Sequence, residues 1–458
     1  MNERITVVGA GLVGCLLSVM LAKRGYRVTL VERRSDIRSA AIYGGRSINL
    51  AMSDRGLAAL DEAGIKDAIL KVAIPMSGRM MHSTDGHQTY QPYGAEGQAI
   101  NSVSRGELNK VLLSCAEECG VSIVFDHRCV DVDTATATAV FEHSTTGEQR
   151  TVQADVLFGA DGAYSAVRDR LMRQDRFDYS QTYLAHGYKE LHIPPAADGG
   201  FVLDKNSLHI WPRHSYMMIA LPNLDGSFTC TLFFAHKGSP SFAELTSRDA
   251  VEQFFNEQFP DAVPLMPTLL DDFMTNPESS LVTVRCAPWV TAGEKVALIG
   301  DAAHAIVPFY GQGMNAGFED CRILMLCLDA ENGDWPRTLR RYESMRKPAG
   351  DAIADLALDN FIEMRDKVAD ERFLLRKKIE GWIHAHYPTK FIPLYTLVTF
   401  SPHVPYHEAL RVGRAQDVLM ERIMTTVPGG PECWNSEGGL AAIKAIMDEL
   451  PTLAMEHQ

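Results

Sequence analysis

Hydrophobic residues recur along the chain with two different periods. Near the N-terminus, residues 4–8 (RITVV) and 27–32 (RVTLVE) are largely apolar runs, while residues 13–25 carry apolar side chains at helical spacing. A short apolar run predicts a buried strand, and a period of about 3.6 residues predicts a helix. The pattern therefore predicts strand, turn, helix and strand, which is the beginning of a parallel α/β sheet.

The pattern changes twice further along the chain. Residues 104–120 predict a helix, because Ser104 and Glu107 form a capping box and Gly120 ends the helical pattern. Between residues 183 and 236, the runs LHIW, YMMIAL and FTCTLFFA are separated by turn-like segments, so we expect an inserted antiparallel sheet. The α/β character returns at KVALIGD, and residues 337–380 predict charged helices.

Composition narrows the class of protein. The chain has 458 residues, of which 46% are hydrophobic and 22% charged, as in ordinary globular proteins. The net charge of −14 argues against a nucleic-acid partner bound through its phosphates. The richest apolar window, FIPLYTLVTF, is about half the length of a membrane-spanning helix. The nine cysteines show no CxxC pair and no Cys/His cluster, so we expect a reduced, cytoplasmic protein without signal peptide or metal site.

The first motif is GAGLVG, which places Gly9, Gly11 and Gly14 between a predicted strand and a predicted helix. Such glycines allow a tight turn, close approach to a pyrophosphate and close packing of helix on strand. Glu32 ends the next strand, where a carboxylate can accept a hydrogen bond from a ribose hydroxyl. The motif predicts a dinucleotide site; a glycine-rich turn without a ligand is the alternative.

Two later motifs also follow predicted strands. In DVLFGADGAYSAVR (155–168), Asp161 follows a strand and precedes a helix, where it is either part of a ligand site or an acidic helix cap. In KVALIGDAAHAIVPFYGQGMN (295–315), Asp301 lies at a strand's carboxyl end, where open α/β sheets bind ligands. Its carboxylate can accept hydrogen bonds from ribityl hydroxyls, and Gly311 and Gly313 let the backbone lie against a flat ring. In the alternative, Asp301 caps a turn and the glycines only shape a loop.

Together and in this order, the three motifs resemble those of the FAD-dependent aromatic hydroxylases. DVLFGADGAYSAVR fits the family pattern D-x-x-x-G-x-D-G-x-x-S-x-x-R at every fixed position, and GDAAHAIVPFYGQGMN fits the stretch that holds the riboflavin part. The resemblance implies bound FAD, with NADPH as a transient co-substrate and O2 as the oxidant. The sequence has no second strand–GxGxxG–helix unit, which suits a family without a separate NADPH domain.

Further segments narrow the resemblance to the kynurenine-hydroxylating members of this family. They include GGRSINLAMSDRG, SGRMMH, HGYKEL, DNFIEM and FIPLYTLVTFS, and the resemblance extends from about residue 4 to residue 410. It implies hydroxylation of L-kynurenine to 3-hydroxykynurenine, a step of tryptophan degradation towards NAD synthesis or quinolinate. Eukaryotic members end in a hydrophobic anchored tail, whereas the last 50 residues here contain PGGPECWNSEGG and an amphipathic segment, so we expect no membrane anchor.

The resemblance also assigns site residues. The implied substrate-binding set joins a carboxylate clamp to an apolar wall for the aniline ring, and consists of Arg79, Tyr93, Phe233, Pro308, Phe309, Tyr310, Asn360, Glu363, Met364 and Tyr395. The implied FAD-binding set consists of Gly9, Gly11, Val13, Gly14, Glu32, Arg33, Arg34, Ala51, Arg105, Val130, Asp161, Asp301, Gly311, Gly313, Met314 and Asn315. Taken singly, a Tyr or Asn on a helix is usually a packing residue, and Arg105 could be a surface charge.

No side chain is assigned as a catalytic acid, base or nucleophile. The flavin carries the difficult chemistry, and the aniline nitrogen of kynurenine activates its own ortho carbon, so the protein positions the ring and excludes water. Tyr310 accordingly receives no acid–base role. Two other readings stay open: another flavoenzyme of the same fold, such as a different aromatic hydroxylase or a ring-modifying reductase, and a non-enzymatic flavin-binding protein. The GWxWxIP motif of flavin halogenases is absent from the sequence.

The predicted fold is therefore α/β, with a Rossmann-like FAD-binding domain, an inserted antiparallel β-sheet substrate domain and a C-terminal helical region. We expect the first part of the FAD-binding domain at residues 1–180, the β-sheet domain at 181–280, the second FAD-binding part with helices at 281–380, and the helical region at 381–458. The sequence does not determine the oligomeric state, and a homodimer is among the assemblies it allows.

Overall fold

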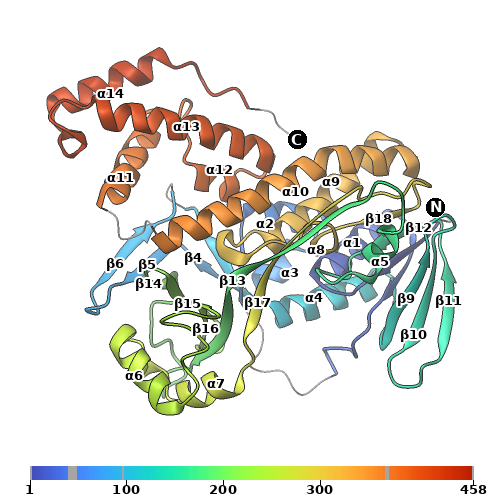
Figure 1. Cartoon of the computed structure of the whole chain (residues 1–458). Coiled ribbons are helices and arrows are strands. Elements are labelled where there is room, and N and C mark those ends of the chain that lie inside the picture. The colour runs from blue at the N-terminus through green and yellow to red at the C-terminus, as the bar shows by residue number, and fades with distance from the viewer. Residues whose placement is uncertain (1–2, 40–48, 95–96, 367–370, 456–458) are drawn as a thin grey trace.

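The computed structural model describes residues 3–39, 49–94, 97–366 and 371–455, without the side chains of residues 364–366. Its parallel sheet has the strand order β18-β12-β1-β2-β8, and Figure 1 labels two of these strands, β12 and β18. The strands are β1 (Arg4–Val8), β2 (Arg27–Val31), β8 (Ser122–Val124), β12 (Val156–Gly159) and β18 (Val296–Leu298). Helix α1 (Leu12–Lys23) follows β1, as the apolar pattern predicts. Strands from distant parts of the sequence are neighbours in this sheet, since β12 pairs with β1 on one side and with β18 on the other.

The second large sheet has seven strands in the order β17-β13-β16-β15-β14-β5-β6. These are β5 (Gly78–His82), β6 (Gln88–Pro92), β13 (Asp178–Ile193), β14 (Ser207–Arg213), β15 (Tyr216–Pro222), β16 (Phe228–Ala235) and β17 (Ser279–Ala287). The predicted strands at 208–211, 216–221 and 228–235 are confirmed. The sheet also recruits β5 and β6 from the segment before residue 181, and β14 pairs with β5 in parallel, so it is wider and less purely antiparallel than expected.

Two three-stranded sheets complete the β-structure. One has the order β3-β7-β4, formed by β3 (Asn49–Met52), β4 (Ala73–Met76) and β7 (Ile100–Ser104). The other has the order β11-β10-β9, formed by β9 (His127–Asp133), β10 (Thr138–His143) and β11 (Gln149–Gln153).

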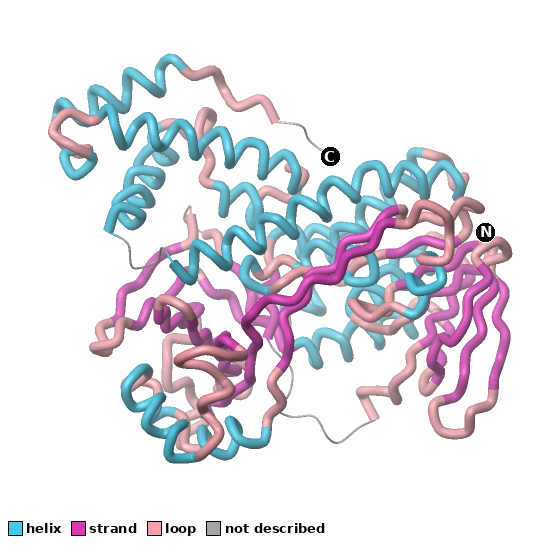
Figure 2. Tube along the Cα trace, in the orientation of Figure 1, coloured by secondary structure: helices cyan, strands magenta, loops and turns pink. Residues whose placement is uncertain are grey.

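Helices cover the sheets and form the C-terminal region (Figure 2). The first group is α2 (Asp54–Glu62), α3 (Lys66–Leu70), α4 (Arg105–Glu118), α5 (Ala166–Leu171), α6 (Arg248–Gln258) and α7 (Leu269–Thr275). The second group is α8 (Asp301–His304), α9 (Gly313–Ala330), α10 (Trp335–Asp366), α11 (Glu371–His386), α12 (Leu394–Phe400), α13 (Tyr406–Thr426) and α14 (Glu437–Glu449). Short 3₁₀ turns lie at Val263–Leu265 (η1), Pro308–Tyr310 (η2) and Pro431–Cys433 (η3).

The capping box predicted at residues 104–107 is wrong. Ser104 does precede α4, but in the described structure its side chain makes no cap hydrogen bond. Ser104 is also the last residue of β7, where it pairs with Asn49 of β3, so strand pairing sets the start of this helix. Gly120 follows the helix with φ +83°, which fits its predicted role as a stop.

The hydrophobic core is divided by these layers. One cluster fills the space around the parallel sheet, and another lies between the seven-stranded sheet and helices α6 and α7. A third joins Phe233 and Phe309 to α10, α12 and α13, and therefore lies where the sheet meets the C-terminal helices. Within the described ranges, no helix combines the length and apolar character needed to cross a bilayer.

Candidate functional site

The turn after β1 contains two glycines that are packed against other backbone atoms and one glycine that faces open space. A side chain at Gly14 would place its Cβ 1.9 Å from the Gly9 oxygen, and one at Gly9, where φ is +103°, would lie 2.6 Å from the Ala160 oxygen. A Cβ at Gly11 meets nothing within 4 Å. Gly9 and Gly14 are thus required by the fold itself, whereas Gly11 leaves open space at the N-terminus of α1, where a phosphate group can approach.

Glu32 is buried directly after β2. Its Oε2 accepts a hydrogen bond from the Ala10 amide at 2.9 Å, and its Oε1 accepts from the Arg34 amide at 3.0 Å and from Arg34 Nε at 2.8 Å. The carboxylate therefore joins the glycine turn to the end of the second strand, which is where the predicted ribose contact would lie. Arg33 and Arg34 are exposed there.

The Asp161 motif forms a tight cap on α5. The Asp161 carboxylate accepts hydrogen bonds from Ser165 Oγ at 2.5 Å and from the Ala166 amide at 2.7 Å, while burial raises its pKa. Arg168 donates to the carbonyl of Ala302 at 3.0 Å, which ties this motif to the turn after β18. The acidic-cap alternative thus describes the Asp161 side chain, and a direct cofactor contact by this carboxylate stays a prediction.

Asp301 is exposed at the start of α8, after Gly300 with φ +62°. A Cβ at Gly300 would lie 3.0 Å from Val13, so the third motif packs against the first helix. The amide of Asn315 donates to the carbonyls of Ala51 at 2.9 Å and Gly311 at 2.8 Å. The predicted residues around the flavin ring are thus held together by Asn315 itself.

The remaining predicted FAD residues lie at the edges of this region. Arg105 is exposed on the first turn of α4, Val130 is partly buried on β9, and Met314 packs partly buried against the core. The three motif turns follow β12, β1 and β18, which are neighbours in the parallel sheet. An open helix N-terminus, a carboxylate after the second strand and an exposed Asp301 at one sheet edge fit an elongated dinucleotide such as FAD.

The predicted substrate residues also come together. The Arg79 guanidinium lies 4.5 Å from the ring centre of Tyr395 and 5.3 Å from that of Tyr93. Tyr395 stacks between Tyr93 at 5.6 Å and Tyr310 at 5.7 Å. These side chains come from β5, from the segment after β6, from η2 and from α12, so the cluster joins the seven-stranded sheet to the C-terminal helices.

Two polar atoms in this cluster are buried without a partner in the described structure: Arg79 Nε and the Tyr93 hydroxyl. Burial raises the pKa values of Tyr93 and Tyr310, so both phenols are neutral near pH 7. A buried donor without an acceptor costs free energy of roughly 1–3 kcal/mol. The arrangement therefore suits an anionic ligand, such as a carboxylate, that accepts from both groups.

The predicted apolar wall forms beside this clamp. Phe309 lies 5.0 Å from Phe233 and 4.4 Å from Phe361 between ring centres. Asn360 donates to the Phe309 carbonyl at 2.7 Å, so its amide holds the η2 turn, and its expected substrate contact stays a prediction. Glu363 is partly buried and 3.8 Å from Lys377, while the side chain of Met364 lies outside the described residues.

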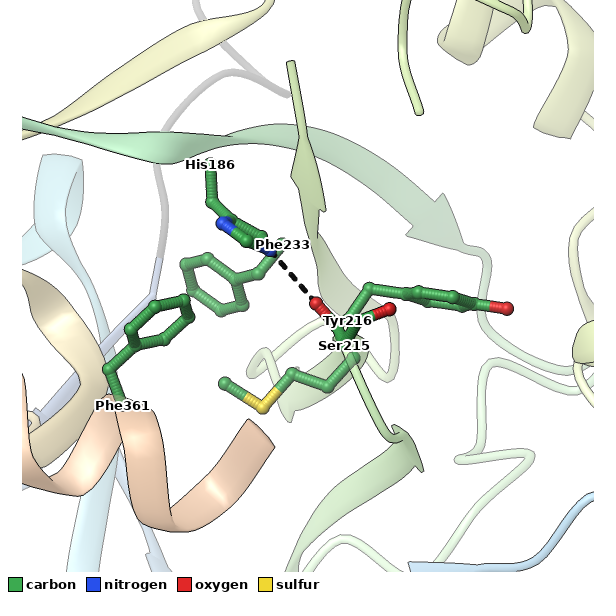
Figure 3. A pocket seen from close by; sticks show the side chains of 6 residues that line it. His186, Ser215, Tyr216, Phe233 and Phe361 are labelled. Carbon is green, nitrogen blue, oxygen red and sulfur yellow. Dashed lines mark hydrogen bonds between the residues drawn. The ribbon is translucent and has the colours of Figure 1, made fainter. Parts of the chain in front are cut away.

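A very small cavity of about 10 Å³ adjoins this wall (Figure 3). It is lined by His186, Ser215, Tyr216, Met217, Phe233 and Phe361, and the ring of His186 bonds the Ser215 carbonyl at 2.9 Å. The sequence did not single out Phe361 or His186, although the segments HGYKEL and DNFIEM, which carry the resemblance, contain them. The described residues contain no cluster suited to a metal ion.

Known proteins resemble the chain over nearly its whole length. Residues 3–357 match the FAD binding domain family. A kynurenine 3-monooxygenase of Flavobacterium psychrophilum is 52% identical over 424 residues, or 92% of this chain and 94% of that protein. One of Stenotrophomonas maltophilia is 42% identical over 457 residues, or 100% of this chain and 99% of that protein. The solved tetrameric form of 2-methyl-3-hydroxypyridine-5-carboxylic acid oxygenase, 22% identical, matches with a TM-score of 0.65 over 81% of this chain and 95% of its own, which confirms the predicted fold class.

Proposed function

This chain belongs to the kynurenine 3-monooxygenase family of FAD-dependent monooxygenases, and we propose that it hydroxylates L-kynurenine at ring carbon 3. NADPH is the proposed electron donor and O2 the proposed oxidant. The reaction would serve tryptophan degradation towards quinolinate and NAD. Membership of an enzyme family argues against the alternative of a non-enzymatic flavin-binding protein.

One observation carries the choice of substrate: the unpaired Arg79 Nε and Tyr93 hydroxyl lie in one buried cluster with Tyr395. Kynurenine has an amino-acid head whose carboxylate can accept from both groups, and an arginine fork suits a carboxylate. Phe233 and Phe309, whose ring centres lie 5.0 Å apart, supply an apolar surface for the aniline ring.

The chain's own residues then have positioning roles. Bound FAD supplies electron transfer from NADPH and the activation of O2. Arg79, Tyr93 and Tyr395 would hold the amino-acid head, and Phe233 and Phe309 would orient the aniline ring and exclude water. The Tyr310 phenol, neutral because burial raises its pKa, would complete the wall without moving a proton. The aniline nitrogen activates its ortho carbon, so no side-chain base is needed.

The test measures product formation by the purified protein. We expect a yellow protein whose NADPH oxidation accelerates when L-kynurenine is added, with 3-hydroxykynurenine formed in proportion. Faster NADPH oxidation without hydroxylated product would mean that kynurenine is an effector of the enzyme, and it would contradict the proposal that kynurenine is the substrate. Hydroxylation of another aromatic acid in preference to kynurenine would identify a different hydroxylase of the same family.

A further inference from the structure

A fully buried arginine outside the predicted site lies between the FAD region and helix α12. Arg55, on the first turn of α2, has no exposed surface. Its guanidinium donates to the carbonyls of Val398 at 2.5 Å, Leu397 at 3.0 Å and Val404 at 2.6 Å. Carbonyls in the last turn of a helix lack partners within the helix, so Arg55 satisfies the C-terminal end of α12 from another part of the chain.

A chain of buried charges anchors this arginine. Arg55 bonds Glu319 at 2.6 Å, and the other oxygen of Glu319 bonds Arg346 at 2.6 Å. Arg346 bonds Asp320 at 2.6 Å, and Asp320 bonds His304 at 2.6 Å. The two arginines and the two carboxylates of this chain balance in charge. The chain of buried charges thus ends at His304, which lies with Asp301 in helix α8. Arg55 is therefore held in place from the FAD side.

A second set of buried contacts also joins Arg55 to the FAD region. The Arg55 guanidinium lies 4.1 Å from the ring centre of Tyr406, the first residue of α13. The Tyr406 hydroxyl donates to the side chain of Gln312 at 2.9 Å, between Gly311 and Gly313. The predicted flavin-facing loop and the start of α13 are therefore joined through buried side chains.

We propose that Arg55 is a positioning residue for the substrate site: by fixing the end of α12 it holds Tyr395 against Arg79. Tyr395 is the second residue of α12, and the Arg79 guanidinium lies over its ring. A shift of this helix would separate the aromatic clamp from the arginine without touching the ligand. The inference rests on the proposed function, because it takes Arg79 and Tyr395 as substrate residues.

The chemistry requires an arginine at this position. Three carbonyls and one carboxylate surround the guanidinium, and its planar fork donates to all four. A lysine keeps the charge but has three donors on one atom, so Arg55→Lys keeps the ion pair and loosens the hold on α12.

The test is a double-mutant cycle on the FAD-loaded protein, with the kynurenine dissociation constant read from flavin absorbance. We expect Arg55→Lys to weaken kynurenine binding about tenfold when Tyr395 is present, and less than about twofold in a Tyr395→Ala background, because coupled residues are not additive. Hydrogen exchange should show faster exchange of the α12 amides in Arg55→Lys. Equal losses in both backgrounds would show that Arg55 does not act through Tyr395.

Arg213→Lys is the matched control, because Arg213 is also buried and also donates to carbonyls, those of Gln258, Pro212 and His82. It should leave kynurenine binding unchanged; a loss equal to that of Arg55→Lys would overturn the proposal. If Arg55→Lys does not fold, Tyr406→Leu takes its place in the cycle, with the same non-additivity expected. Failure of the wild type to bind kynurenine would instead contradict the proposed function.

Discussion

Arg79 brings a guanidinium into a cluster of tyrosine rings, and among the described residues no carboxylate pairs with it. If the substrate carboxylate is its partner, Arg79→Ala leaves that charge unpaired, which costs roughly 2–5 kcal/mol of binding free energy. We therefore expect the kynurenine dissociation constant to rise by a factor of about 30 to several thousand while FAD stays bound. Flavin absorbance titrations measure both.

The control ligand is a kynurenine analogue without the carboxylate. It should bind the wild type poorly and be nearly indifferent to Arg79→Ala, and Arg79→Lys should restore kynurenine binding only in part. Equal losses for the two ligands would mean that Arg79 shapes the pocket and does not hold a carboxylate.

Individual residues were predictable where they matched a motif and unpredictable where burial decides their role. Arg79, Tyr93 and Tyr395 were expected together from three separate segments, and the structure brings them together. Arg55 lies within one of the recognised segments, but nothing in a sequence says that an arginine on a polar-looking helix turn has no exposed surface. Its partners come from residues more than 260 positions away in the chain.

At the scale of an element, the turn after β1 separates glycines required by the fold from one left open for a ligand. Gly14→Ala would place a Cβ 1.9 Å from the Gly9 oxygen, so we expect the apoprotein to lose roughly 1–3 kcal/mol. Gly11 has φ −73° and open space, so Gly11→Ala should leave apoprotein stability within about 1 kcal/mol of wild type.

The affinity for FAD should distinguish the Gly11 position from the Gly14 position a second time. The Gly11 methyl group would stand where a pyrophosphate approaches, so Gly11→Ala should weaken FAD binding by about tenfold or more. Thermal melting of the apoprotein and a flavin fluorescence titration separate the two effects. Full FAD affinity in a well-folded Gly11→Ala protein would place the phosphates elsewhere.

The periodicity of apolar residues predicted individual helices and strands better than it predicted which strands pair with one another. Three strands of the seven-stranded sheet, β14, β15 and β16, were expected from apolar runs, but β5 and β6 lie more than 100 residues before β14, and no local signal links them. The capping box at Ser104 failed for a related reason, since pairing of β7 with β3 fixes the residue that the local pattern assigns to the helix.

The pairing of β5 with β14 also creates a buried pair of histidines. His209 Nε2 faces the Asp204 carbonyl at 2.8 Å, so it carries hydrogen, and Nδ1 accepts from His82 at 2.9 Å. His82 in turn bonds Asp261 at 2.7 Å. Burial lowers the pKa of His209 to about 4.

This histidine makes stability depend on pH in a defined window. The unfolded chain takes up the proton below about pH 6.5, but the folded imidazole does so only near 4, so stability is lost as pH falls from 6.5 to 4. The full loss is up to about 3 kcal/mol. Urea unfolding between pH 7 and 5 should show a shallower decline for His209→Gln; parallel curves would mean that other groups cause the decline.

The molecule contains two kinds of ion pair, exposed and buried. Exposed pairs such as Arg372–Glu421, at 3.0 Å, are screened by water and contribute little. The chain of buried charges around Arg346 extends from the parallel-sheet domain to the C-terminal helices, and all its members are shielded from solvent. Neither kind of ion pair follows from the sequence, because a charge pattern does not distinguish a solvated helix face from a buried contact.

Arg346 is the central cation of the buried chain, bonded to Glu319 and Asp320, both with lowered pKa because the neighbouring cations outweigh burial. Arg346→Met leaves two carboxylates short of a partner, so unfolding free energy at pH 7 should fall by about 3–5 kcal/mol, against about 0–1 kcal/mol for Arg372→Met. Removing the cation raises both carboxyl pKa values relative to the wild type, because one of the groups that lower them is lost. The variant therefore loses less stability than the wild type as pH falls, and its deficit should narrow from pH 7 to pH 5. Urea titrations at the two pH values measure this, and a constant deficit would mean that Arg346 contributes packing and not charge.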